Sequence, residues 1–256
     1  MQITDDKIIK NRHGGSDLIF IDRLNHRFKH LFNLMAEHQE EPRETPDRIL
    51  KSAEILFAER GFDMVSLRDI TGSAGANVAA VNYHFGSKDK LIDAVVAKHV
   101  TPINEARLRR LDKIEKEHLG GPVPVDEILT AFLSPVLNHI TSGEMSEDLF
   151  KKFMGRLIGE RGYQLPEGVR PLFGIMASRF SMALRESVPH LSEEAALWRM
   201  HFSFGVMSNT LTHGDTLRQI SGGRAGNPSI ESIFREVIQF CAAGIEAVEE
   251  GEDEEL

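Results

Sequence analysis

The residues whose types and spacing could do chemistry gather between positions 66 and 88. Residues 78–85 carry Asn82, Tyr83 and His84 and contain no acid, and Lys88 follows shortly after them. An amide side chain can read the edge of a base, and tyrosine, histidine and lysine can contact phosphate. Lys88 also lies at the expected start of a helix, where free amide groups and the helix dipole favour an anion. The segment therefore predicts contacts to double-stranded DNA.

Two short helices joined by a glycine-containing turn are expected to position these side chains. Ser66 can cap the first helix, and Asp69 lies three residues further on, which is close to a capping box. Gly75-Ala76-Asn77 forms the turn, and the second helix runs from about Val78 to Phe85. This layout is typical of a helix-turn-helix, whose second helix enters the major groove.

Other expected helices surround this pair. Thr45 can cap a helix with Pro46 at its first position, and Gly61 can end it. Ser87 can cap a helix from Lys88 to about Val100, after which Thr101-Pro102 predicts a break. Beyond the break we expect helices over residues 102–117, 124–141, 146–161, 168–188, 192–213 and 229–248. No alternating strand pattern is visible, so the predicted fold class is all-α.

The expected starts and ends of these helices divide the chain into four regions. Residues 1–44 are expected to be an extension that is either poorly ordered or the product of a wrongly assigned start. Residues 45–100 would form the helix-turn-helix head and residues 101–248 the helical body. Residues 249–256 form an acidic tail, which is expected to be solvated charge.

Charge and cysteine content bear on the protein's partners and on its cellular compartment. The net charge of −9 is unfavourable for a nucleic-acid binder, but six acids lie in the tail, and residues 43–100 carry eight basic and eight acidic side chains. Bulk charge therefore neither supports nor opposes DNA binding. The single Cys241 excludes an internal disulfide, and neither a signal peptide nor an apolar run long enough for a membrane span is visible. We expect a cytoplasmic protein without a membrane partner.

The residue types also argue against an enzyme. The eleven histidines show no metal-ligand spacing, and the sequence contains no HExxH or GxSxG motif and no phosphate-binding glycine loop. We therefore expect no catalytic residue, no metal site and no cofactor. Two alternatives stay open beside a DNA-binding repressor: an interaction module that keeps the head without binding DNA, and an activator.

One longer run carries a resemblance to a known family. Ile49, Leu56-Phe57, Gly61-Phe62, Ser66-Leu67-Arg68-Asp69-Ile70, Gly75-Ala76-Asn77 and the run from Val81 to Leu91 together look like the DNA-binding domain of the TetR family. The resemblance implies an all-helical homodimer whose body encloses a small-molecule pocket. It also implies a palindromic operator, which the dimer leaves when a ligand spreads its two heads. Residues 102–111 more weakly resemble a branch that senses fatty acids or their CoA thioesters.

The resemblance also implies which residues contact DNA. Tyr83, His84 and Lys88 would contact phosphate, and Ser66 and Arg68 would touch the backbone or groove. The residues expected to face the bases are Asn77, Val78, Ala79 and Asn82. Many family members carry threonine-leucine where this chain has Ala80-Val81-Asn82, so the base preference stays open. Other roles are open to three of these residues: Tyr83 could pack the head's core, Lys88 could be a solvated charge, and Arg68 could pair with Asp69.

Large, soft side chains in the body predict a ligand pocket. The residues expected to line it are Arg156, Phe173, Arg179, Trp198 and Phe202. An acidic group on a ligand could pair with a buried base there, and so could Glu160, Glu186 or Glu194; plain core packing is the other alternative. The resemblance implies that the helices over 192–213 and 229–248 form the dimer interface. A two-fold dimer would place two reading helices about one helical turn of DNA apart.

Overall fold

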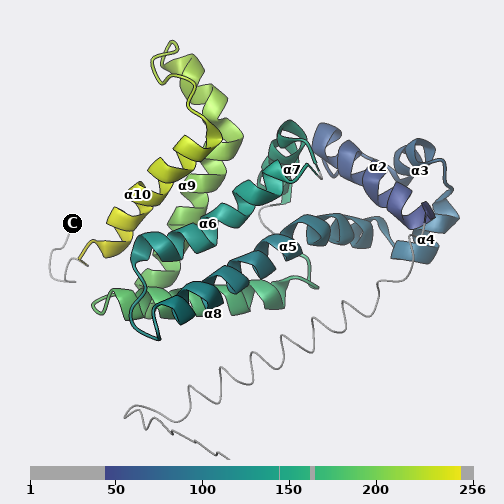
Figure 1. The fold of residues 1–256 in the computed structure, drawn as a ribbon. Coiled ribbons are helices and arrows are strands. Elements are labelled where there is room, and N and C mark those ends of the chain that lie inside the picture. Colours follow the sequence, from purple (N-terminus) through teal and green to yellow (C-terminus); the bar gives the residue numbers. More distant parts are fainter. Residues whose placement is uncertain (1–43, 144, 162–164, 249–256) are drawn as a thin grey trace, which may run out of the picture. The chain divides into compact units, whose positions relative to one another are not determined.

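The computed structural model describes residues 44–143, 145–161 and 165–248 (Figure 1). Within these ranges the chain forms nine helices and no strand, so the predicted all-α class is confirmed. The expected extension, apart from its last residue, and the acidic tail lie outside the described residues. None of the described helices is both long enough and apolar enough to cross a membrane.

Three helices form the head: α2 (Glu44–Arg60), α3 (Leu67–Ala74) and α4 (Val78–Phe85). Apolar side chains from all three and from the α2–α3 turn fill its core, and Phe57, Phe62, Ile70 and Val81 are fully buried. The α2 helix ends just before Gly61, whose backbone φ is 89°. Residues that carry a Cβ rarely adopt this backbone conformation. Packing in this core thus fixes the orientation of α4 relative to α2 and α3.

The helix α5 (Lys88–Glu117) leaves the head and continues without interruption into the body. The predicted break at Thr101-Pro102 is therefore wrong, because Pro102 lies inside the helix. A proline in a helix removes one backbone hydrogen bond and costs about 3 kcal/mol. Buried side chains on both sides of it, including Val96, Val100, Ile103 and Leu108, hold the helix together. Tertiary packing outweighs the local penalty here.

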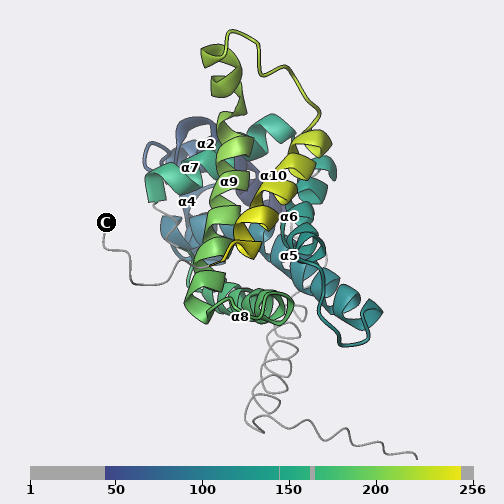
Figure 2. The same ribbon diagram turned by 90° about the vertical axis from the view of Figure 1, so that its left-hand side faces the viewer.

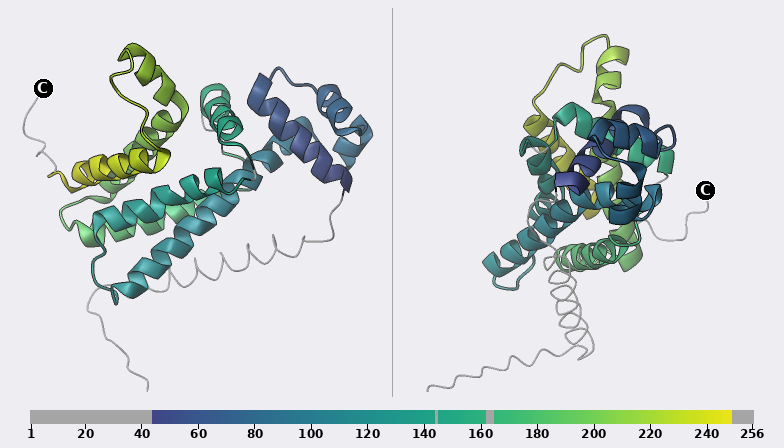
Figure 3. Two further views of the ribbon diagram at one scale, coloured as in Figure 1. Left: turned by 45° about the horizontal axis from the view of Figure 1, so that its top comes forward. Right: turned by 90° about the vertical axis from the view of Figure 1, so that its right-hand side faces the viewer.

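Five further helices build the body: α6 (Val125–Thr141), α7 (Glu147–Arg161), α8 (Arg170–Ser187), α9 (Glu193–Ile220) and α10 (Ile230–Glu246). The α6 and α8 helices pack on α5 and on each other, while α10 pairs with α9 and α6 (Figures 2 and 3). The α7 helix packs more extensively on α2 than on any helix of the body. It therefore joins the head to the body.

The α9 helix is longer than the sequence predicted. The expected end was residue 213, but the helix continues to Ile220 and ends before Gly222 and Gly223, which both adopt positive φ. His213-Gly214 does not interrupt it, because a single glycine in a helix costs only about 1 kcal/mol. The last turns of α9 and the loop before α10 extend beyond the other body helices (Figure 1).

Candidate DNA-binding surface and body cavity

Local capping fixes the α3–turn–α4 unit. The Ser66 hydroxyl accepts a hydrogen bond from the Asp69 amide, and the Asp69 carboxylate accepts one from the Ser66 amide, which completes the predicted capping box. The α3 helix ends at Gly75, whose φ of 59° lies in the left-handed region. Asn77 then caps α4, because its Oδ1 accepts a hydrogen bond of 2.8 Å from the Ala80 amide. Capping hydrogen bonds at the starts of both helices and the positive φ of Gly75 thus fix the conformation of the α3–turn–α4 unit.

The outer face of α4 offers small and polar groups to a partner. Val81 packs into the core, whereas Ala79 and Asn82 are exposed and Tyr83 is 85% exposed. The helix contains no acid. Phosphate would meet no repulsion from α4 itself, and the exposed Tyr83 does not serve the core of the head.

Basic and hydroxyl side chains surround α4. Ser66 and Arg68 are exposed at the start of α3, and His84 is half-buried with its ring 4.9 Å from that of Tyr83. The Lys88 ammonium lies 3.5 Å from the Asp63 carbonyl oxygen, near the start of α5. All nine residues expected to contact DNA therefore lie on α3, α4, or the capping and starting residues of these helices and α5.

A cavity of about 330 Å³ lies in the body, and α5, α6, α7, α8 and α9 all contribute to its walls. Most of the lining is apolar and includes Phe132, Phe150, Phe173, Met176 and Met200. The polar members are His99, Asn104, Arg107, Lys151, His201, Ser208 and Thr212. Cavities of this size and character hold small organic molecules in other proteins.

Two family models match separate parts of the chain. One, described as "Bacterial regulatory proteins, tetR family", matches residues 49–95, and the other, described as "Tetracyclin repressor-like, C-terminal domain", matches residues 130–244. The chain belongs to the TetR family. The first match covers the head and the start of α5, and the second covers most of the body.

Two curated transcriptional regulators match the chain over about fifty residues each. The chain is 41% identical over 54 residues to a probable HTH-type transcriptional regulator, YttP, of Bacillus subtilis, covering 21% of this chain and 26% of the relative. It is 48% identical over 48 residues to the HTH-type transcriptional repressor Rv3405c of Mycobacterium tuberculosis, covering 19% of this chain and 26% of that protein. The chain thus aligns with about a quarter of the length of these curated relatives.

The fold also resembles that of AmtR from Mycobacterium smegmatis. The two structures match with a TM-score of 0.51 and 17% identity over 83% of this chain and 91% of AmtR. At this identity the likeness concerns the TetR fold alone.

Four of the five residues expected to line a pocket lie outside the body cavity of this TetR-family chain; Phe173 alone among them lines it. The Arg156 guanidinium pairs with Glu160 at 2.7 Å, and Arg179 pairs with both Asp112 and Glu115 at 2.7 Å. These arginines therefore have acidic partners within the chain. Trp198 and Phe202 stack on the surface of α9 and are 54% and 57% exposed.

The polar residues of the cavity wall on α5 were not predicted from the sequence. His99, Asn104 and Arg107 are buried among the apolar residues of α5. Polar residues among apolar ones were the signal in the sequence, but the expected break at Thr101-Pro102 divided these residues between two separate helices.

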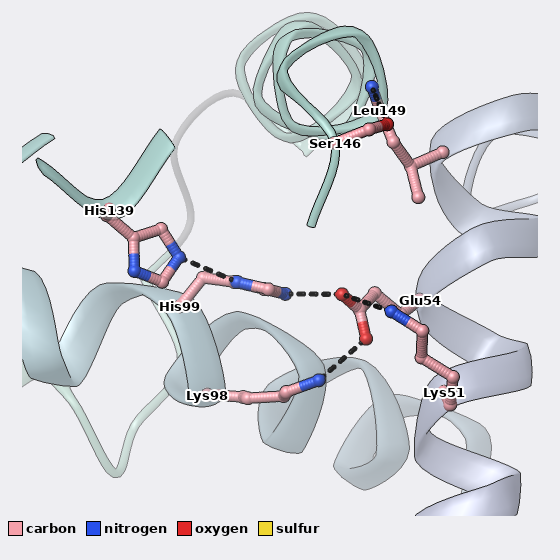
Figure 4. Close-up of polar contacts among 7 residues, drawn as sticks. All are labelled: Lys51, Glu54, Lys98, His99, His139, Ser146 and Leu149. Atoms are coloured by element: carbon pink, nitrogen blue, oxygen red, sulfur yellow. Dashed lines mark hydrogen bonds and ion pairs between the residues drawn. The ribbon is translucent and has the colours of Figure 1, made fainter. Parts of the chain in front are cut away.

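A buried charge network connects the TetR head to the cavity wall (Figure 4). Glu54 of α2 is fully buried, and its carboxylate lies 2.7 Å from the Lys98 ammonium. His99 Nε2 lies 3.2 Å from Glu54 Oε1, an ion-pair distance without hydrogen-bond alignment, and His99 Nδ1 lies 3.0 Å from His139 Nε2. Burial alone would raise the pKa of Glu54, but His99 and Lys98 outweigh it and lower the pKa from 4.5 to about 2.

A second polar contact joins α7 to the head. The Glu160 carboxylate accepts a hydrogen bond of 2.8 Å from the Phe62 amide. A Cβ at Gly61 would lie 2.4 Å from Glu160 Oε1, so only glycine lets the carboxylate approach this closely. Because other residues of α7 line the cavity, this helix contacts both the cavity and the head.

Proposed function

We propose that this protein is a DNA-binding transcriptional repressor that leaves a palindromic operator when a small, largely apolar effector fills the body cavity. The observation that carries the proposal is the course of α5. Its first turns pack in the head beside α4, and its later turns supply His99, Asn104 and Arg107 to the cavity wall. One continuous helix therefore connects the DNA-facing and the ligand-facing parts.

We assign α4 to the major groove. Asn77, Val78, Ala79 and Asn82 would face the bases, with Ser66, Arg68, Tyr83, His84 and Lys88 on the phosphates and groove edges. The exposure of Asn82 and Tyr83 and the absence of acids on α4 support this assignment. Asn77 has a further role, because its side-chain oxygen already caps α4. Its contribution to DNA binding would therefore include holding the helix start in place.

We assign α9 and α10 to a homodimer interface. Each helix presents exposed aromatic side chains, Trp198 and Phe202 on α9 and Phe240 on α10, and Phe240 is 70% exposed. Exposed large aromatic groups commonly mark protein interfaces. A two-fold dimer would bind two half-sites and would explain a palindromic operator.

The lining of the cavity supports a proposal for the effector class. Its apolar lining favours a molecule with a substantial hydrocarbon part, and the weak resemblance of residues 102–111 to a fatty-acid-sensing branch favours an acyl compound. The name of one relative, a transcriptional repressor, supports repression over activation.

The proposal is tested by selecting bound sequences from fragmented genomic DNA with the purified full-length protein. We expect a palindromic sequence that binds more weakly as salt rises. Recovery of no preferred sequence would contradict the proposal and favour an interaction module that kept the head as a scaffold. Transcription from the selected site, measured with and without the protein, separates a repressor from an activator.

A further inference from the structure

The walls of the body cavity combine an apolar interior with basic side chains. The lining contains Arg107, Lys151, His99 and His201, and among the residues that line it there is no aspartate or glutamate. Two of these side chains have an acid beside them: the Glu147 carboxylate lies 2.6 Å from the Lys151 ammonium, and Glu54 Oε1 lies 3.2 Å from His99 Nε2. Arg107 is buried, with only 3% of its surface exposed. Such walls favour an occupant that carries a negative or hydrogen-bond-accepting group.

The contacts of Arg107 fix the orientation of Asn104. Arg107 Nη1 donates to Asn104 Oδ1 over 2.8 Å, and Arg107 Nε donates to the Phe132 carbonyl oxygen over 2.7 Å. A guanidinium has donors only, so the side-chain oxygen of Asn104 must face Arg107 and its NH₂ group must be turned away from it. The amide of Asn104 is therefore oriented as a donor toward another partner.

That partner is missing from the described part of the chain. The Nδ2 atom of Asn104 is buried and makes no hydrogen bond to any residue there. A buried amide donor without an acceptor is costly, and native structures rarely tolerate one. Because Asn104 lines the cavity, an acceptor atom on an occupant could supply the bond.

We propose that the body cavity binds an apolar molecule that ends in a carboxylate or acyl carbonyl, and that Asn104 and Arg107 form the subsite for that end. The inference rests on the proposed function, since it names the chemical class of the effector. Arg107 holds Asn104 in place and contributes its charge, while Asn104 donates the hydrogen bond. Phe132 flanks the subsite, with its ring centroid 4.4 Å from Arg107 Cζ. Phe173 and Met176 of α8 and Met200 of α9 would contact the hydrocarbon part.

The test compares three probes with the same chain length: decanoate, methyl decanoate and decylamine. Each is titrated calorimetrically into the full-length protein. We expect decanoate to bind at least about tenfold more tightly than decylamine, because the ammonium group only donates and meets basic walls. Methyl decanoate distinguishes the sources of recognition: binding close to that of decanoate assigns it to the carbonyl, and much weaker binding assigns it to the charge.

Two substitutions test the subsite directly. Asn104→Leu removes the donor, and Asn104→Asp replaces it with an acceptor while keeping the shape; each should weaken decanoate binding about tenfold or more. Asn138→Leu, the same change at an exposed residue of α6 that does not line the cavity, is the matched control and should bind decanoate as the unchanged protein does. Thermal unfolding of each variant checks that it is folded, and the comparison of probes on the unchanged protein is independent of any variant.

Decylamine binding as tightly as decanoate, no binding of any probe, or full decanoate affinity in a folded Asn104→Leu protein would overturn the inference. Sequence-specific DNA binding is measured on the same preparation. If the protein binds DNA sequence-specifically but the probes do not bind in the expected order, only the proposed effector class is contradicted. Decanoate binding that follows the expected order in a protein without sequence-specific DNA binding would support the subsite and contradict the proposed function.

Discussion

At the scale of single residues, Glu54 and Lys88 show two different uses of charge. Glu54 of α2 is buried and lies against Lys98 and His99 of α5, so its charge stabilises the contact between these two helices. Lys88 lies near the start of α5, next to the DNA-facing helix. The first charge should therefore govern stability, and the second should govern DNA affinity.

Glu54 should make stability depend on acid pH. Its pKa is lowered from 4.5 to about 2, so its contribution is complete above pH 4.5 and is lost as the pH falls toward 2. A shift of this size corresponds to roughly 3 kcal/mol of unfolding free energy. In Glu54→Gln, stability at pH 7 should fall and this part of the pH dependence should vanish in urea unfolding between pH 2 and 7. A variant with unchanged pH dependence would show that the network does not hold the charge.

Lys88→Ala should weaken binding to all DNA sequences alike. Loss of one phosphate contact should reduce the slope of log affinity against log salt by about one unit. Fluorescence anisotropy with specific and unrelated duplexes at several salt concentrations measures both effects. Lys113→Ala, which removes an exposed lysine paired with Glu117 in the body, is the control and should leave the slope unchanged. A loss restricted to the preferred sequence would contradict the phosphate assignment.

At the scale of elements, α5 and α7 both run from the cavity to the head. The sequence predicted α3 and α4 closely, because capping residues and glycines mark their ends, whereas Thr45, the expected cap of the first helix, lies inside α2. It did not predict that α5 continues through Pro102, because local preference says nothing of the packing that stabilises the helix. The pairing of Arg156 with Glu160, four residues further along the same helix, was among the alternatives that the sequence offered. The pairing of Arg179 with Asp112 and Glu115 was not, because helical periodicity places a residue on a face without saying which element meets that face.

Gly61→Ala should loosen the contact between α7 and the head. The added Cβ would meet Glu160 Oε1, and the φ of 89° is strained for any residue with a side chain. We expect a loss of about 1–3 kcal/mol in unfolding free energy. Gly72→Ala is the matched control, since nothing lies within 4 Å of its added Cβ, and in α3 it should be neutral or stabilising. Equal stability of the two variants in chemical denaturation would contradict the close approach of Glu160.

At the scale of the whole molecule, DNA binding should require two copies of the chain. Trp198 and Phe202 were expected in the pocket and instead lie exposed on α9, which fits an interface better than a cavity wall. Their type suggested burial, and only the arrangement of the helices shows that more than half of each side chain is exposed within the described part of the chain.

Phe240→Glu should convert the protein into a monomer, because a charge would be buried in the interface. Sedimentation velocity should show half the mass, and operator affinity should fall by at least tenfold. Leu119→Glu, at an exposed residue between α5 and α6, should leave the protein dimeric. A dimer that survives Phe240→Glu would place the interface elsewhere.

The most direct test of the account is a footprint of the purified protein on its selected DNA sequence, repeated with decanoate. We predict two protected half-sites related by two-fold symmetry, about one helical turn apart, and loss of protection when decanoate is added. Protection without sequence preference, at the same salt concentration and over competitor DNA, would contradict the claim that this chain is a sequence-specific regulator. Protection that decanoate leaves unchanged would agree with a sequence-specific regulator and would contradict a carboxylate effector.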